Sequence, residues 1–165
     1  MRRIHAMEGD MELDRTDRAI LEALQRDGSL TNAALAEIVH LSASQCSRRR
    51  AALEAAGLIA GYAVRLDAGR LGIGLRAVVR VNLRSHGQER EGGFARFVDD
   101  HPQIRAAFSV SGDADYVLDV QVPDLEAFAR FVHDHLLPHP QVAHVRSEIV
   151  LKTLKDRAGP DLSQL

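Results

Sequence analysis

Three consecutive arginines, Arg48-Arg49-Arg50, form the strongest local concentration of positive charge in the chain. Guanidinium groups bind phosphate oxygens and guanine edges, so such a run is typical of contact with DNA. At 3.6 residues per turn, three consecutive helical residues spread over about 300° of the helix surface. One or two of them can therefore face DNA while another lies along the flank. Taken alone, the run fits a solvated helix face equally well.

A helix start lies directly before the arginines. In Ser42-Ala43-Ser44-Gln45 the Ser42 hydroxyl can accept the Gln45 N–H while the Gln45 side chain reaches back, which is a capping box. The predicted helix continues through Cys46 and Leu53 to Gly57. Recognition helices contact bases with their N-terminal residues, and N–H groups at a helix start attract phosphate. The residues predicted to contact DNA are Ser42, Ser44, Gln45, Ser47, Arg48, Arg49 and Arg50, with Ser42 acting mainly as the cap.

Two shorter helices are predicted before this one. Asp14 is a suitable N-cap for the first, with Asp17 in its first turn and Gly28 at its end. Thr31 is an acceptable cap for the second, whose predicted apolar face is Leu35, Ile38 and Val39. Three such helices make a helix-turn-helix. A strand or wing is expected to follow, with Leu58, Ile59, Tyr62 and Val64 closing the domain.

A change of period marks a second domain. Apolar residues alternate along Leu75–Arg84, Ile104–Val110, Tyr116–Val122 and Val145–Leu151, as they do in half-buried strands. Helical spacing lies between these runs, and the residues that carry it are Phe94, Phe97 and Val98, then, after the cap Asp124, Leu125, Phe128, Ala129, Val132 and Leu136. The order β-α-β-β-α-β is the ferredoxin-like pattern.

The predicted fold class is therefore α+β, with an N-terminal winged helix-turn-helix and a C-terminal ferredoxin-like domain. The boundaries are a disordered tail over residues 1–12, the helix-turn-helix over 13–64, a linker over 65–74, the second domain over 75–155 and a C-terminal tail over 156–165. Helices can cover only one face of the sheet. Val78, Ala107 and Val117 are expected on the other, which suits packing against a partner sheet in at least a dimer.

Composition narrows the function without naming it. The net charge is −2, and residues 1–70 carry ten Lys and Arg against ten Asp and Glu, so bulk charge does not indicate nucleic acid. The single cysteine, Cys46, excludes an internal disulfide and fits a reducing cytoplasm, and we expect it to be buried. No catalytic motif, cofactor motif or run of about 20 apolar residues stands out. Surface histidines are a better interpretation of His133 and His135 than a metal site, because positions two apart do not share a helix face.

The chain resembles the Lrp/AsnC family of transcriptional regulators over residues 13–155. The stretches that carry the resemblance are Leu13–Leu21, Leu41–Cys46, Leu53–Tyr62, and Val110–Tyr116 followed by Val122-Pro123-Asp124. The resemblance implies a dimer built through the C-terminal domains, larger assemblies such as octamers, and a small effector, usually an amino acid. In one position the chain departs from the family, which often has an apolar residue in place of Arg50. Either Arg50 packs its aliphatic part along the helix, or the helix is rotated.

The turn Ser111-Gly112-Asp113-Ala114-Asp115 lies inside the last of these stretches. Turn amides and a carboxylate could hold the two ends of a zwitterionic amino acid, although on spacing alone a plain β-turn is the better interpretation. The resemblance favours effector binding, with Ser111, Gly112, Asp113 and Asp115 as the contact residues.

Together these features predict a cytoplasmic, sequence-specific DNA-binding regulator that responds to a small effector and is not an enzyme. One alternative is an architectural protein whose oligomer wraps DNA with little ligand control. Another is a small-molecule-binding or enzymatic domain whose N-terminal helices mediate protein contacts only. The arginine run after a capping box argues against that last alternative.

Overall fold

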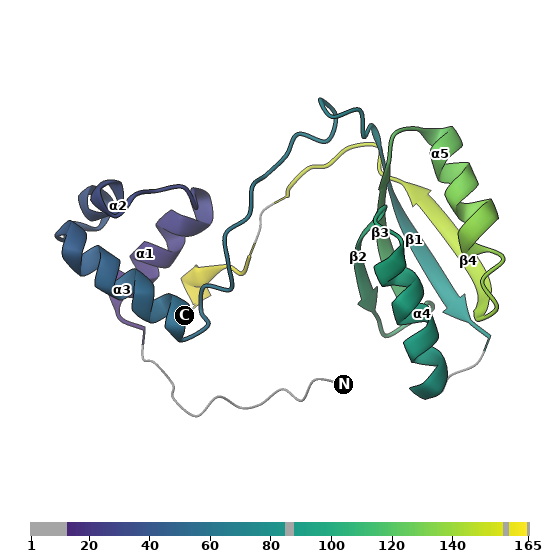
Figure 1. Ribbon diagram of the computed structural model, residues 1–165, viewed down its shortest axis with the longest axis horizontal. Helices are drawn as coiled ribbons and strands as arrows, with labels where there is room; N and C mark the ends of the chain where they lie inside the picture. Colours follow the sequence, from purple (N-terminus) through teal and green to yellow (C-terminus); the bar gives the residue numbers. More distant parts are fainter. Residues whose placement is uncertain (1–12, 85–87, 157–158, 165) are drawn as a thin grey trace. The chain divides into compact units, whose positions relative to one another are not determined.

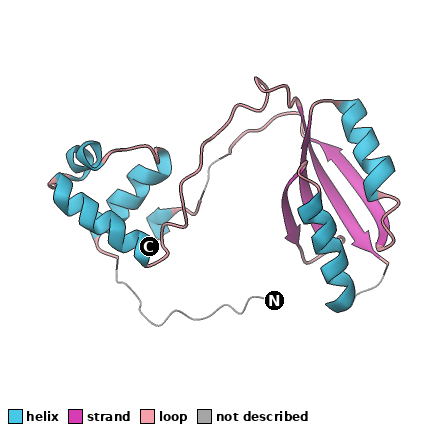
Figure 2. Ribbon diagram, in the orientation of Figure 1, coloured by secondary structure: helices cyan, strands magenta, loops and turns pink. Residues whose placement is uncertain are grey.

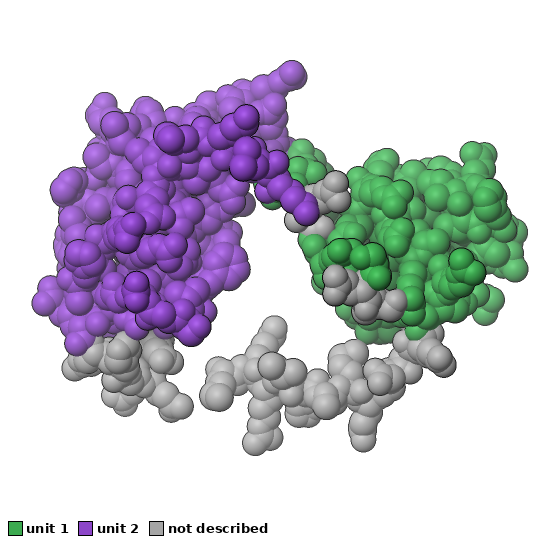
Figure 3. Space-filling view, turned by 180° about the vertical axis from the view of Figure 1, so that it is seen from behind, with its two compact units in different colours: residues 1–65, 156–165 green, residues 66–155 purple. Residues whose placement is uncertain are grey.

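The computed structural model describes residues 13–84, 88–156 and 159–164. Contacts divide the chain into two compact units, one of residues 1–65 with 156–165 and one of residues 66–155 (Figure 3). The first unit is therefore discontinuous, because the chain returns to it after completing the second. The predicted tail over residues 1–12 lies outside the described residues, whereas the described part of the predicted C-terminal tail belongs to the first unit.

The described part of the first unit contains three α-helices, α1 (Arg15–Arg26), α2 (Asn32–Val39) and α3 (Ala43–Ala55), and one short 3-10 helix, η2 (Leu162–Gln164) (Figure 1). The predicted caps are confirmed, since Asp14 and Asp17 form a capping box on α1, Thr31 caps α2, and Ser42 forms a capping box on α3. These side chains satisfy N–H groups that a helix start leaves unpaired. The helices therefore begin where local sequence dictates.

The three helices enclose a small core. Its buried residues are Ile20, Ala23, Leu24, Leu35, Ala36, Cys46 and Leu53. Cys46 is fully buried, as predicted. The prediction for Ile38 is wrong, because α2 turns Ala36 toward the core and leaves Ile38 half exposed. The predicted strand over residues 58–64 is also not formed, and this stretch is extended loop in which Val64 is exposed.

The second unit has the predicted βαββαβ order. Its elements are β1 (Leu75–Leu83), α4 (Gln88–Asp100), β2 (Ile104–Ser109), β3 (Tyr116–Val122), α5 (Leu125–Arg130), a π-helical continuation η1 (Phe131–Leu136) and β4 (Val142–Ile149). The sheet is antiparallel with strand order β2-β3-β1-β4 (Figures 1 and 2). This is the ferredoxin-like arrangement.

Both helices of this unit pack on one face of the sheet. The alternating residues Ala77, Val79 and Val81 of β1 are fully buried there, with Phe94 of α4 and Phe131 of η1 beside them. On the other face lie the intervening residues of the strands, which makes that face open in the single chain. Each helix in the described part of the chain is too short or too polar to span a bilayer.

Two irregularities overturn detailed predictions. A register shift between Ile104 and Ala106 changes the alternation of β2. Ala107 therefore pairs with Leu118, on the helix-covered side, and Phe108 pairs with Val117 on the open face. The expected placement of Ala107 on the open face is wrong, because one extra residue in a β-bulge reverses the faces of the residues beyond it.

The second irregularity is the π-helical end of α5. A π turn inserts one residue into the helical repeat, so the inward positions shift. Phe131 and Leu136, five residues apart, are both buried, whereas Leu125 and Ala129 are exposed. The predicted apolar face is wrong for Leu125 and Ala129, which precede the π segment and lie on the exposed side of α5.

Candidate functional site

The first turn of α3 is exposed and held by its cap. The Gln45 N–H donates to the Ser42 hydroxyl at 3.2 Å, and the Ser42 N–H donates to Gln45 Oε1 at 3.0 Å. The Ser42 and Ser44 hydroxyls lie 3.1 Å apart. The side chains of Ser42 and Gln45 are therefore engaged in the cap, and the exposed Ser44 and Ser47 lie beside them.

The three arginines that follow have different surroundings. Arg48 is exposed and has no ion pair or hydrogen bond with any described residue. Its guanidinium is therefore available to a partner molecule. Arg49 and Arg50 are both partly buried and both bind groups of their own unit.

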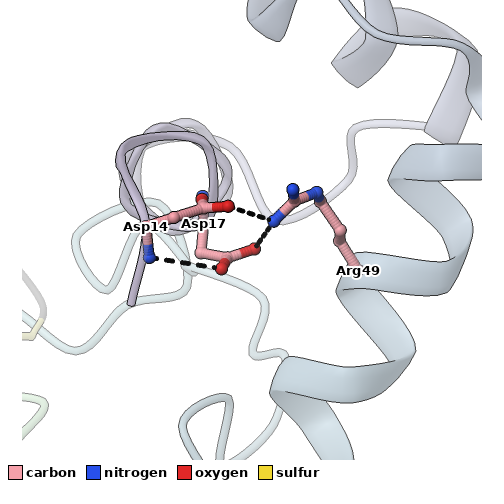
Figure 4. Close-up of polar contacts among 3 residues, drawn as sticks. All are labelled: Asp14, Asp17 and Arg49. Carbon is pink, nitrogen blue, oxygen red and sulfur yellow. Dashed lines mark hydrogen bonds and ion pairs between the residues drawn. The ribbon is translucent and has the colours of Figure 1, made fainter. Parts of the chain in front are cut away.

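Arg49 binds the start of α1 (Figure 4). Its Nη1 lies 2.7 Å from Asp17 Oδ1 and 2.8 Å from Asp14 Oδ2. The Asp17 N–H in turn donates to Asp14 Oδ1 at 2.7 Å, and this bond, together with Arg49, holds the pKa of the Asp14 carboxyl below its usual value. Hydrogen bonds to Asp17 and then Asp14 raise the pKa of Arg49. The three side chains therefore form one charged cluster between α3 and α1.

Arg50 contacts a different part of the first unit. Its Nη1 donates to the Leu30 carbonyl at 3.0 Å and its Nε to the Tyr62 hydroxyl at 2.8 Å, while the guanidinium carbon sits 4.6 Å from the centre of the Tyr62 ring. The Tyr62 hydroxyl donates to Glu54 Oε1 at 2.7 Å. Burial, and then this bond to Glu54, raise the pKa of Tyr62. The Arg50 guanidinium therefore binds groups of its own unit, including Glu54 one turn further along α3.

The predicted effector turn connects β2 and β3 and is tied to the end of β1. Asp115 Oδ2 accepts the Leu83 N–H at 2.7 Å, and the Asp115 N–H donates to the Val81 carbonyl at 3.1 Å. Asn82 Nδ2 donates to the Asp113 carbonyl at 2.6 Å. These bonds fix the turn, and the Asp115 carboxylate is one of the groups that fix it.

The tip of the turn is available to a ligand. Ser111, Gly112 and Asp113 are all exposed, and Gly112 has a φ of +132°, a backbone conformation that favours glycine. The Asp113 carboxylate has no hydrogen-bond or ion-pair partner among the described residues. The structure therefore separates two carboxylates that the sequence left equivalent, with Asp113 free and Asp115 structural.

Three histidines gather elsewhere in the second unit. The His101 ring packs against His135 and Phe97, with ring centres 5.2 and 4.1 Å apart, and His139 packs against Phe97 at 4.8 Å. Burial, and then the charge of His101, lower the pKa of His139. Within the described residues, no three His, Cys, Asp or Glu side chains are grouped so that they could hold a metal ion.

The sequence did not indicate some of the residues that position the candidate DNA-binding and effector-binding side chains. Asp14 and Asp17 could be identified as helix-capping residues, but nothing in their spacing indicates Arg49 as a partner. Tyr62 was expected in a strand and instead contacts Arg50. Asn82 could have been suspected only as a polar residue near a strand end.

Comparison with known sequences agrees with this two-unit arrangement. The family model for winged helix-turn-helix DNA-binding matches residues 13–60, and the model for the Lrp/AsnC ligand binding domain matches residues 76–160. The fold and the matches define a transcriptional regulator with a DNA-binding unit and a small-molecule-binding unit. The chain belongs to the Lrp/AsnC family of transcriptional regulators.

Individual relatives span nearly the whole chain. The Bkd operon transcriptional regulator of Pseudomonas aeruginosa is 39% identical over 92% of this chain and 99% of its own length. The transcriptional regulator AzlB of Bacillus subtilis is 34% identical over 93% of this chain and 98% of its own. Among solved structures, a transcriptional regulator of Neisseria meningitidis in complex with L-Met is 38% identical, with a TM-score of 0.89 over 93% of this chain and 99% of that one.

Proposed function

We propose that this regulator contacts DNA through Arg48 and the exposed N-terminal residues of α3, and that an amino acid bound at the 111–113 turn controls it. The availability of Arg48 carries the first part, since Arg49 and Arg50 bind their own unit. Ser44, Gln45 and Ser47 lie on the N-terminal turns of α3, the part of a recognition helix that meets base edges. The Ser42 cap leaves helix N–H groups to face a phosphate.

The DNA contact is tested by measuring affinity against salt concentration. The probe is a duplex that the wild-type protein selects from a randomised library. Arg48→Gln should weaken binding and, if Arg48 contacts a phosphate, reduce the slope of log affinity against log salt by about one unit. Arg26→Gln, on the exposed side of α1, is the matched control and should bind like wild type. Wild-type affinity and slope for Arg48→Gln would contradict the proposal.

The amino-acid effector is supported by chemistry and by similarity. A zwitterion needs N–H donors for its carboxylate and an acceptor for its ammonium group. The exposed backbone around Gly112 offers the donors, and the free Asp113 carboxylate offers the acceptor. The regulator of Neisseria meningitidis that this chain resembles was solved with L-Met. Asp115, as the tie to Leu83, positions the turn.

Calorimetry with L-methionine, followed by the other proteinogenic amino acids, tests this assignment. One of them should bind wild type and bind Asp113→Asn much more weakly. Ser109→Ala, a neighbouring change outside the turn, serves as the control. Equal affinity for wild type and Asp113→Asn would place the effector elsewhere.

The open face of the sheet is proposed as the surface that joins two copies of the chain. Val78 and Val117 lie there half-buried, and Phe108 is exposed. Arg76 binds Asp119 through two hydrogen bonds of 2.9 and 2.8 Å, so its charge is already matched within the face. A face on which apolar side chains lie among charges, one pair of which is already matched within the face, suits burial against its own copy.

Light scattering on the full chain tests this interface. Wild type should be a dimer or larger, and Phe108→Asp should shift it toward a smaller species. Leu125→Asp, on the exposed side of α5, is the matched control and should leave the assembly unchanged. A monomeric wild-type protein at micromolar concentration would contradict the proposal.

A regulator of this kind acts where DNA lies, so we infer a cytoplasmic location and no catalytic role.

A further inference from the structure

We propose that Arg49 is a positioning residue for DNA recognition, which fixes α3 on α1 and does not itself touch DNA. The inference rests on the proposed role of α3 in binding DNA. It concerns which arginine of the run reaches DNA and which one sets the angle of the helix. The contacts of Arg49 within its own unit favour the second role.

One nitrogen of Arg49 serves two carboxylates. Its Nη1 binds Asp17 at 2.7 Å and Asp14 at 2.8 Å, and the Asp17 side chain is only 6% exposed. Charge-assisted hydrogen bonds of this length are among the stronger polar contacts in proteins. A phosphate brought to this nitrogen would also meet two negative charges. The local electrostatics therefore favour the internal pairing over a DNA contact.

The acceptor pair is itself rigid. Asp14 and Asp17 form the capping box of α1, in which the Asp17 N–H donates to Asp14 Oδ1 at 2.7 Å and the Asp14 N–H approaches Asp17 Oδ2 at 3.4 Å. Arg49 therefore binds a first turn of α1 that the capping box already holds rigid. A tie between two rigid helices constrains their angle more than a contact with a free loop would.

Arg50 links α3 to other parts of the same unit. Arg50 donates to the Leu30 carbonyl, in the connection before α2, and its Nε donates to the Tyr62 hydroxyl. The two ties leave Arg48 as the arginine of the run that projects without an internal partner among the described residues. A binding group must be held within about 0.5 Å and 10–20° of its productive geometry, so loss of either tie should lower DNA affinity.

Substitution of Asp17, the acidic partner of Arg49, separates two explanations, because they predict opposite changes in DNA affinity. Asp17→Asn removes a negative charge near a DNA-binding helix, so simple electrostatics predicts tighter binding to DNA. A positioning role predicts weaker binding, because Arg49 loses its shorter ion pair. If the two residues act through one contact, the double variant Asp17→Asn with Arg49→Gln should be no weaker than Arg49→Gln alone.

The experiment measures binding of the selected duplex by fluorescence anisotropy across a salt series for the full-length variants. Arg49→Gln and Asp17→Asn should each lower affinity by about tenfold, which corresponds to about 1.4 kcal/mol. Their salt slopes should match wild type, whereas the slope of Arg48→Gln falls by about one unit. Circular dichroism checks folding. If Arg49→Gln does not fold, Asp14→Asn at the more exposed acceptor replaces it.

Two results overturn the positioning role. A slope for Arg49→Gln that falls by about one unit would make Arg49 a phosphate contact. Tighter binding by Asp17→Asn would show that its charge matters only by repelling DNA. In both cases wild type still binds the duplex, so the proposed function stands. If wild type selects no duplex at all, the proposed function itself fails.

Discussion

The two units of this chain are stabilised in different ways. Among the residues whose burial is described, the second unit buries fourteen apolar residues of its sheet, α4, α5 and η1 in one cluster, whereas the cluster of the first unit has seven, two of them alanines. Both units also have polar contacts between elements, and in the first unit those of Arg49 and Arg50 link α3 to residues outside it. A helix that must keep one face exposed for DNA has little surface left for a core. Under the proposal above, the charged contacts of Arg49 and Arg50 help to orient this helix.

The largest expected effect is a loss of stability in the second unit when its hydrophobic core is disrupted. Phe94 is fully buried and stacks near Phe97 and Tyr116, with ring centres 5.8 and 5.0 Å away. Phe94→Ala should destabilise the second unit by about 3–5 kcal/mol, because it removes a large side chain and leaves a cavity. Urea unfolding, read by hydrogen exchange in each unit, measures this. Leu151→Ala, at a position 95% exposed, is the control. A loss below about 1 kcal/mol for Phe94→Ala would contradict the assigned core.

Loss of the polar contacts of Arg50 should lower the stability of the first unit, by less than the loss of Phe94 lowers that of the second. Arg50→Met keeps an aliphatic stem and removes the bonds to Leu30, Tyr62 and Glu54. The expected loss is about 1–2 kcal/mol in the first unit alone. Arg48→Met, the neighbouring variant with no internal partner to lose, should stay within about 0.5 kcal/mol of wild type. Equal stabilities of the two variants would show that the Arg50 tie contributes nothing.

The stabilities of the two units should respond differently to acidification. Burial lowers the pKa of His139, so the folded second unit binds fewer protons there than the unfolded chain does. Its stability should fall as the pH drops below the ordinary histidine value of 6.5. In the first unit, bonds from the Asp17 N–H to Asp14 and from Ser29 to Asp27 lower both carboxyl pKa values, so its loss begins only near 3.8.

Hydrogen exchange at a series of pH values measures this difference. Protection of α4 and η1 should decrease between neutral pH and pH 5, while protection of α1 and α3 stays constant. His139→Gln should remove the pH dependence of the second unit over this range. If the first unit loses protection before the second, or if His139→Gln still shows the full change, the pH account is wrong.

The smallest expected effect concerns the return of the chain to the first unit. Gln25 Nε2 donates to the Pro160 carbonyl at 2.9 Å, and Gly159 has a φ of +80°. A Cβ at Gly159 would lie 2.4 Å from Gln25 Nε2. Gly159→Ala should therefore cost about 1 kcal/mol in the first unit. Gly69→Ala, whose backbone is not left-handed, is the matched control for thermal unfolding. No difference between them would show that this return adds no stability.

Local signals predicted most of the fold. The caps at Asp14, Thr31 and Ser42 and the alternation of β1 each depend on residues a few positions apart, which sequence displays directly. The bulge in β2 and the π turn at η1 change the period in mid-element, and a periodic pattern cannot anticipate an inserted residue. The same limit applied to the site, because the partners of Arg49 lie 32 and 35 residues away and only folding brings them together.

The proposed function has two parts. The chain binds one DNA sequence in preference to others, and a bound amino acid changes its affinity for that DNA. The most direct measurement titrates wild-type protein against the selected duplex and a shuffled duplex of equal composition, with and without the amino acid that binds best in calorimetry. We expect tighter binding to the selected duplex than to the shuffled one, and a change in this affinity of about 5- to 150-fold on adding the amino acid. Equal affinity for both duplexes, unmoved by any amino acid, would contradict the proposed function and would indicate an architectural DNA-binding protein.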